Sequence, residues 1–213
     1  MGGFDFWFQI CAALICFVYV ILQVYHNKWM WVVWAVSSIA CFIVYLDESL
    51  YTNMLIQVYF FFAAIYGFMV WIREEKANAA AGIKPANSKE IIVHPIEPKK
   101  AIISTAIAVA VFFILVWLYT KVFPAELNNN SPWLDPLCAS FSMLATYWLS
   151  QSWIEEWYIW FGVNALSVWM YMQTKMYPFA VLYFFLFLIA VKGLLNWKKN
   201  GKVVKPEPKK KLK

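Results

Sequence analysis

The chain has 213 residues, of which 63% are hydrophobic and only 14% are charged, and its mean hydropathy is +0.59. A soluble globular domain carries about 25% charged residues, so the composition excludes that class and predicts an integral membrane protein. The formal net charge of +6 does not indicate a nucleic-acid-binding protein, because the basic residues cluster in loops and in a tail beside hydrophobic segments.

Seven hydrophobic segments follow one another along the chain, each near the length of about 20 residues that crosses a bilayer. The first has neither a basic region before it nor a small-residue cleavage site after it, so it is expected to be a retained helix and not a signal peptide. The predicted fold class is an all-α integral membrane protein with seven transmembrane helices. These helices are expected at residues 4–25, 29–46, 52–72, 101–122, 134–150, 154–172 and 178–196.

The last three hydrophobic segments repeat the first three. Residues 157–197 align without a gap to residues 31–71, and each partner is 126 positions later. The segment 101–122 has no counterpart, so the helices group as three, one and three, and the odd linker helix makes the two triplets parallel repeats about an axis along the membrane normal. The identical pairs are Trp31 and Trp157, Trp34 and Trp160, Tyr45 and Tyr171, Tyr51 and Tyr177, Phe61 and Phe187, Gly67 and Gly193, and Trp71 and Trp197.

The same pattern predicts the domain organisation and the orientation. Residues 1–72 and 123–197 form the two repeats, 101–122 the linker helix, 73–100 a flexible cytoplasmic loop and 198–213 a basic cytoplasmic tail that attracts anionic lipid. If the N-terminus lies outside, fifteen Lys and Arg residues face the cytoplasm and two face outside. The positive-inside rule therefore predicts a cytoplasmic C-terminus.

Helix interiors offer little for catalysis or ion coupling. Every Asp and Glu falls at a helix end or in a loop, which argues against a proton or sodium relay. The four cysteines match no zinc, haem or redox spacing and are expected to pack in apolar surroundings. His26 and His94 have no ligand partner at helical spacing. No catalytic residue, metal site or cofactor is predicted, and the chain is not expected to be an enzyme.

Polar and aromatic side chains share faces on two of the expected helices. Trp157, Trp160 and Asn164 are spaced i, i+3 and i+7 on one stripe, and Asn53 and Gln57 are spaced i and i+4. An amide in hydrocarbon needs a partner, so these groups are expected to point inward. Hydrogen bonds between helices would explain any single amide equally well.

The repeat favours a ligand site over structural hydrogen bonding. Asn164 corresponds to Ser38 and Gln57 to Tyr183, so the polar groups are asymmetric within a symmetric frame. An indole platform with one or two amides suits a flat, delocalised, polar ring, and a cation over such a ring can gain about 2 kcal/mol when desolvated. The full set of candidate substrate-binding residues is Trp160, Asn164, Gln57, Asn53, Trp157, Trp34 and Tyr147.

Several motifs resemble one family. They are Trp160-x-x-x-Asn164, the run Tyr171 to Tyr177-Pro178, Gly193-x-x-x-Trp197-Lys198-Lys199, the stretch Tyr51 to Tyr59, Tyr66-Gly67-x-x-x-Trp71, Pro132-Trp133-Leu134-Asp135, and Glu155. With these motifs, residues 10–199 resemble the PnuC family of bacterial vitamin transporters. The resemblance implies a three-one-three fold related to SWEET sugar transporters, residence in the bacterial inner membrane and assembly as a homotrimer.

The resemblance also implies a mechanism. Nicotinamide riboside would pass down its gradient and be trapped inside by phosphorylation, with Trp160, Asn164 and Gln57 lining the site. Two departures bear on the substrate: Trp34 stands where the family usually has glycine, and Gln151-Ser152 replaces a basic pair. Relatives carry thiamine or riboflavin, and thiamine, also flat and cationic, is the alternative substrate. A second alternative is a non-transporting membrane scaffold.

Overall fold

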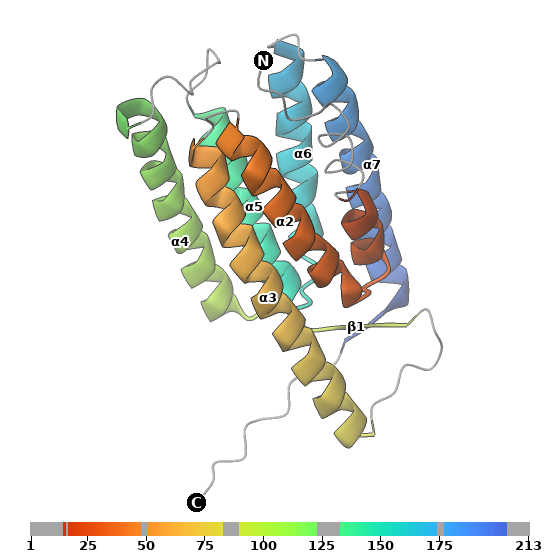
Figure 1. Cartoon of the computed structure of the whole chain (residues 1–213). Helices are drawn as coiled ribbons and strands as arrows, with labels where there is room; N and C mark the ends of the chain where they lie inside the picture. Colours follow the sequence, from red (N-terminus) through yellow and green to blue (C-terminus); the bar gives the residue numbers. More distant parts are fainter. Residues whose placement is uncertain are drawn as a thin grey trace, which may run out of the picture.

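The computed structural model describes residues 15, 17–47, 51–82, 90–122, 133–173 and 177–203, with the side chains of residues 178 and 179 left aside. They form a bundle of seven helices (Figure 1), so the predicted all-α fold class is confirmed. The first described helix covers residues 17–24. The others are α2 Trp29–Asp47, α3 Tyr51–Ala80, α4 Pro98–Trp117 with a π-helical turn at Leu118–Val122, α5 Leu134–Ser150, α6 Glu156–Gln173 and α7 Tyr177–Asn200.

Four of these helices are long and apolar enough to cross a membrane, counting only the part of the chain that the structure describes. They are α2, α3, α4 with its π-helical turn, and α7 from Ala180 onward. All of them leave large apolar side chains on the outside of the bundle, such as Val36 on α2, Phe62 on α3 and Ile107 on α4. Such outward-facing apolar surface is what lipid requires of a membrane bundle.

The described parts of the segment 73–100 differ from the flexible connector that was expected, and residues 83–89 lie outside the described residues. Helix α3 continues to Ala80, because the residues after Arg73 are mostly strong helix formers and need no bilayer around them. A short strand β1, Ile91–Val93, then pairs in parallel with β2, Gly201–Val203, which belongs to the expected tail. Figure 1 shows β1 below the bundle, and we call this the β1 end.

The repeat is visible in where the helices begin and end. Asp47 and Gln173 end α2 and α6, and Tyr51 and Tyr177 begin α3 and α7, with 126 residues between the members of each pair. The first helix and α5 also end 126 residues apart, at residues 24 and 150. The helical frame therefore follows the sequence repeat and extends it back to the end of the first helix.

Each repeat contains the same glycine–tryptophan contact. A Cβ atom added at Gly67 would lie 2.5 Å from the ring of Trp31, and one added at Gly193 would lie 2.3 Å from the ring of Trp157. Both indoles are almost completely buried, at 0% and 1% exposure. Only glycine lets the two helices of each pair approach this closely.

We expect Gly193→Ala to destabilise the protein by about 1–3 kcal/mol, because the added methyl group overpacks a filled core. Gly162→Ala on α6 is the matched control, since a Cβ there would meet nothing within 4 Å. The control should be neutral or stabilising by about 0.5–1 kcal/mol through lower helix entropy. Thermal unfolding in detergent measures both, and equal midpoints for the two variants would contradict the packing argument.

The two repeats meet at a pair of equivalent turns near the β1 end. His26 and Ser152 both have positive φ angles, 50° and 53°, and lie 126 residues apart in the chain. The His26 Nε2 atom is 3.2 Å from the Ser152 Oγ atom. The backbone N–H of His94, just after β1, donates to the carbonyl oxygen of Ser152 at 3.2 Å. The segment around β1 therefore docks on the junction between the repeats.

Acid is expected to weaken this junction. His26 stacks on Trp71 at 3.9 Å and meets Trp197 edge-on at 4.9 Å, and its burial, with a smaller effect from His94, lowers its pKa from 6.5 to about 3. The unfolded chain binds this proton below about pH 6.5, whereas the folded protein excludes it until about pH 3. The stability that neutral His26 contributes is thus present above pH 6.5 and is lost as the pH falls towards 3.

The measurement is thermal unfolding of the wild type and of His26→Asn at several pH values between 7.5 and 4. Asparagine tolerates the positive φ angle and does not titrate. The variant is expected to be less stable at pH 7.5 and to lose less stability on acidification. Parallel pH profiles for the two proteins would show that His26 is not the titrating group.

Candidate functional site

A cavity of about 280 Å³ lies between the two repeats. Its volume is close to the lower end of the range for small-molecule pockets, about 300–1,000 Å³. The first described helix, α2, α3, α5, α6 and α7 all contribute to it, whereas no residue of α4 does among those described. The lining residues are Tyr19, Trp34, Ser37, Cys41, Tyr45, Asn53, Ile56, Gln57, Phe60, Asp135, Cys138, Ala139, Ser142, Trp160, Val163, Asn164, Ser167, Met170, Tyr171, Tyr183 and Leu186.

Five of the seven candidate residues come together in this central cavity: Trp160, Asn164, Gln57, Asn53 and Trp34. Helical spacing explains the grouping, because residues four apart lie on one face. Two of the five are on α6 and two are on α3, and the last is on α2. The stripes recognised in the sequence therefore converge on one cavity from both repeats.

The aromatic wall is built around Trp34. Its ring stacks on Tyr19 at 4.8 Å and on Trp31 at 5.7 Å, with interplanar angles of 9° and 5°. Trp160, its repeat counterpart, lies 6.4 Å away at 51°. Trp34 is 4% exposed and its faces are largely used by protein neighbours, whereas Trp160 is only half-buried. Trp160 is therefore the indole better placed to receive a flat ligand.

The amides differ in how far the protein satisfies them. The Oδ1 atom of Asn53 accepts a bond from the Tyr119 hydroxyl at 3.4 Å. The side chains of Gln57 and Asn164 form no hydrogen bond with another described residue, although Asn164 is only 5% exposed. A buried amide without a partner costs about 1–3 kcal/mol. Water or a ligand in the cavity would remove this cost.

Within the described residues, the cavity lining contains one formally charged side chain. Asp135, in the first turn of α5, lines the cavity, and no Lys, Arg or His does so among the described residues. A carboxylate in the lining favours cationic over anionic ligands. Asp135 was expected at a helix end and was not among the predicted site residues, although it ends the family motif Pro132 to Asp135.

Two candidate residues lie outside the central cavity. Trp157 is 1% exposed, packs against Gly193 and borders a small side cavity of about 40 Å³. Tyr147 lines a separate surface cavity together with Tyr59 and Lys100. The tyrosines Tyr19, Tyr45 and Tyr183 were not candidates, yet they line the central cavity. Of these three, Tyr45 could have been found from the sequence. Its repeat counterpart, Tyr171, lies seven residues after Asn164 and therefore on the same face of α6.

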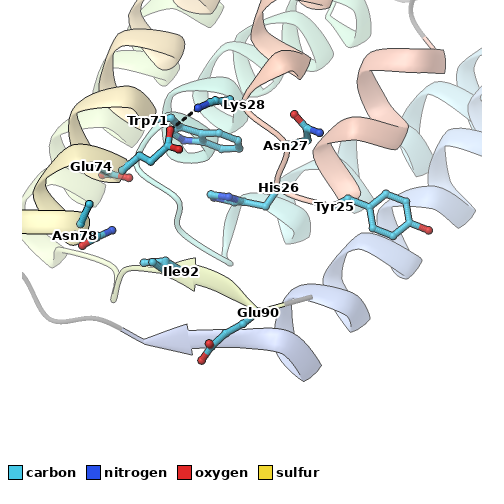
Figure 2. Close-up of a pocket in the computed structure, with 11 residues that line it drawn as sticks. Tyr25, His26, Asn27, Lys28, Trp71, Glu74, Asn78, Glu90 and Ile92 are labelled. Atoms are coloured by element: carbon cyan, nitrogen blue, oxygen red, sulfur yellow. Dashed lines mark hydrogen bonds and ion pairs between the residues drawn. The ribbon is translucent and has the colours of Figure 1, made fainter. Parts of the chain in front are cut away.

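A second polar pocket, of about 470 Å³, lies at the β1 end. Figure 2 shows the His26 ring beside Trp71, with Glu74 and Asn78 of α3 on one side and Glu90 below. The Glu74 carboxylate lies 3.4 Å from His94 Nε2, while Lys28 pairs with Glu75. No cluster of three or more His, Cys, Asp or Glu side chains within the described ranges could hold a metal ion in either pocket.

Comparison with known proteins is consistent with this geometry. A family model described as nicotinamide mononucleotide transporter matches residues 6–199. The nicotinamide riboside transporters PnuC of Escherichia coli (strain K12) and of Shigella flexneri are each 24% identical over 221 aligned residues, covering 92% of this chain and 87% of the relative. The crystal structure of the vitamin B3 transporter PnuC matches with a TM-score of 0.64 and 17% identity, over 92% of this chain and 83% of that one.

Proposed function

Because the chain belongs to the nicotinamide mononucleotide transporter family, and is thus a multi-pass membrane transporter, we propose that it carries nicotinamide riboside. Transport would be facilitated diffusion, with the riboside trapped inside by phosphorylation. For a cation, the membrane potential adds an inward drive of about 2.3 kcal/mol per 100 mV. No coupling ion is required by this proposal.

The charged groups of the central cavity favour the riboside over the mononucleotide as the substrate. The family description names the mononucleotide and the relatives are named for the riboside, and the two compounds differ by a phosphate group. The lining has Asp135 and, within the described residues, no basic side chain. An unpaired phosphate there would lose its hydration without gaining a partner, which is costly. The riboside, with a cationic ring and neutral hydroxyl groups, fits the same lining.

The polar groups suit the parts of this substrate. The pyridinium ring would stack on Trp160, and the carboxamide and ribose hydroxyls would bond with Asn164 and Gln57. Asp135 would balance the ring charge across the cavity. Thiamine would use the same platform and charge, so the site alone leaves it as the competing ligand.

Calorimetric titration of detergent-purified protein tests this proposal. We expect nicotinamide riboside to bind and the mononucleotide to bind at least about tenfold more weakly, because its phosphate meets a carboxylate in a desolvated cavity. Thiamine is titrated in parallel. Tighter binding of the mononucleotide than of the riboside would refute the charge argument. Binding of thiamine without binding of the riboside would make thiamine the substrate.

The β1 end is proposed to face the cytoplasm of a bacterium, with the protein in the inner membrane and the N-terminus outside. The basic residues that the structure describes support this orientation: the β1 end carries Lys28, Arg73, Lys76, Lys99, Lys100, Lys198, Lys199 and Lys202, and the opposite end carries Lys121. A membrane-impermeant maleimide should label Lys121→Cys in intact spheroplasts. It should label Asn200→Cys only after permeabilisation, and the reverse pattern would invert the topology.

Assembly as a homotrimer is part of the same proposal. Helix α4 presents Ile102, Ile107, Phe113 and Trp117 outward at 57–70% exposure, and it takes no part in the central cavity among the described residues. A helix outside the site is free to pack on a neighbouring copy. Native mass spectrometry of the detergent-released protein gives the copy number directly, and a monomer would remove this part of the proposal.

A further inference from the structure

A buried carboxylate lies beside the central cavity and is used by none of the contacts described above. Glu156, in the first turn of α6, is 0% exposed. Gln23, at the end of the first described helix and 3% exposed, donates its Nε2 to both Glu156 oxygens at 3.2 and 3.3 Å. None of the ion pairs among the described residues includes Glu156.

The repeat shows that the bundle does not need a carboxylate at this position. The offset of 126 relates Gln23 to Leu149 and Met30 to Glu156. Leu149 and Met30 are each 0% exposed and belong to the same hydrophobic core. At the positions related by the repeat, the bundle therefore has the apolar pair Met30 and Leu149, which is similar in size to Gln23 and Glu156. Replacing a buried ionisable group by apolar residues of similar size is often neutral or stabilising, so stability alone does not explain Glu156.

The Gln23–Glu156 pair lies next to the central cavity. Gln23 lines the small side cavity together with Trp160 and Asn164, and these two residues also line the central cavity. Glu156 precedes Trp160 by one helical turn, a rise of about 6 Å towards the β1 end. At low dielectric a charge still acts strongly over such a distance. A carboxyl group buried without a cation is compensated either by a proton or by the positive charge of a ligand.

We propose that Glu156, held in place by Gln23, selects cationic over neutral heteroaromatic ligands as they move from the central cavity towards the β1 end. This inference rests on the proposed function and adds a specificity-determining residue to it. Burial without a cation favours the protonated form of Glu156, and a cationic ligand at Trp160 favours its ionised form, so this carboxyl group responds to ligand charge without direct contact. Gln23 positions the carboxylate and separates it from the side cavity.

The test compares the wild type with Glu156→Gln and with the double variant Gln23→Leu/Glu156→Met. The first removes charge and keeps size, and the second copies the apolar pair of the other repeat, so folding is expected to survive. The ligands are nicotinamide riboside and its reduced, uncharged form, dihydronicotinamide riboside. Glu155→Gln, which removes a half-buried carboxylate that lines an apolar surface cavity, is the matched control.

Both Glu156 variants are expected to lower the ratio of cationic to neutral affinity on the order of tenfold, with neutral binding unchanged. Glu155→Gln should leave the ratio as in the wild type. An unchanged ratio in folded Glu156→Gln, shown by a wild-type melting point, would overturn the inference and leave the pair structural, with the proposed function intact. A wild type that binds neither ligand would overturn the proposed function and this inference together.

Discussion

Replacing Trp160 by alanine is expected to weaken nicotinamide riboside binding by about a hundredfold. The indole supplies both a cation–π contact, about 2 kcal/mol when desolvated, and stacking on a heteroaromatic ring, about 1–3 kcal/mol per ring. These contributions overlap, so we expect the binding free energy to weaken by about 2.7 kcal/mol in total, which is about a hundredfold in affinity. Trp160→Phe should retain part of the binding because a smaller aromatic face remains.

Trp169→Ala is the matched control for Trp160→Ala. Both tryptophans are on α6, but Trp169 is 53% exposed on the outside of the bundle and does not line the central cavity. Its removal should leave affinity unchanged in detergent. Calorimetry measures both variants, and a change under about threefold in folded Trp160→Ala would remove the stacking site. A non-transporting scaffold would tolerate either substitution.

Replacing Asn164 by leucine is expected to abolish most binding while leaving the protein as stable or more stable. The amide is 5% exposed, opens onto the cavity and has no protein partner among the described residues, so its removal breaks no hydrogen bond within the protein. The ligand loses its hydrogen bond and meets an apolar group, which we expect to weaken binding by about a hundredfold. A gain in stability with a loss of binding is the mark of a site residue.

Ser38→Ala provides the control at the equivalent position of the first repeat. The Ser38 hydroxyl donates to the Trp34 carbonyl oxygen at 3.0 Å within α2, and Ser38 is not part of the cavity lining. Its loss should affect binding little. If Asn164→Leu lowered the melting point as much as the affinity, Asn164 would be a structural group and the asymmetry of the repeat would have another cause.

The choice of substrate depends on which charged groups reach the centre of the bundle. The aromatic and amide groups alone accept several flat rings, whereas the roles proposed for Asp135 and Glu156 restrict the choice to cations. Neither carboxylate is at the middle of its helix, since each lies in a first turn. They belong to opposite ends of the bundle, because α5 and α6 run antiparallel (Figure 1). A cation crossing the central cavity would therefore pass between them.

The sequence by itself determined the membrane class, the repeat and the approximate positions of the helices that the structure describes. Bilayer thickness and the need to satisfy backbone groups leave few alternatives for a long apolar segment, and this is why α5 was predicted with its observed bounds, Leu134–Ser150. Helical spacing also grouped Trp160 with Asn164 and Asn53 with Gln57. These relations are local, since they depend on the rise and turn of one helix.

Only the tertiary structure decided which of these faces meet and how deep a helix end is buried. Tyr147 faces a different cavity, which residues of α3, α4 and α5 line together, and the sequence does not show which helices pack around one another. Glu156 was predicted to lie at a helix end, and only the structure shows that it is fully buried there and bonded to Gln23 of the first helix. The pairing of β1 with β2 joins segments more than a hundred residues apart. Such contacts arise from the packing of the whole bundle, so no local pattern reports them.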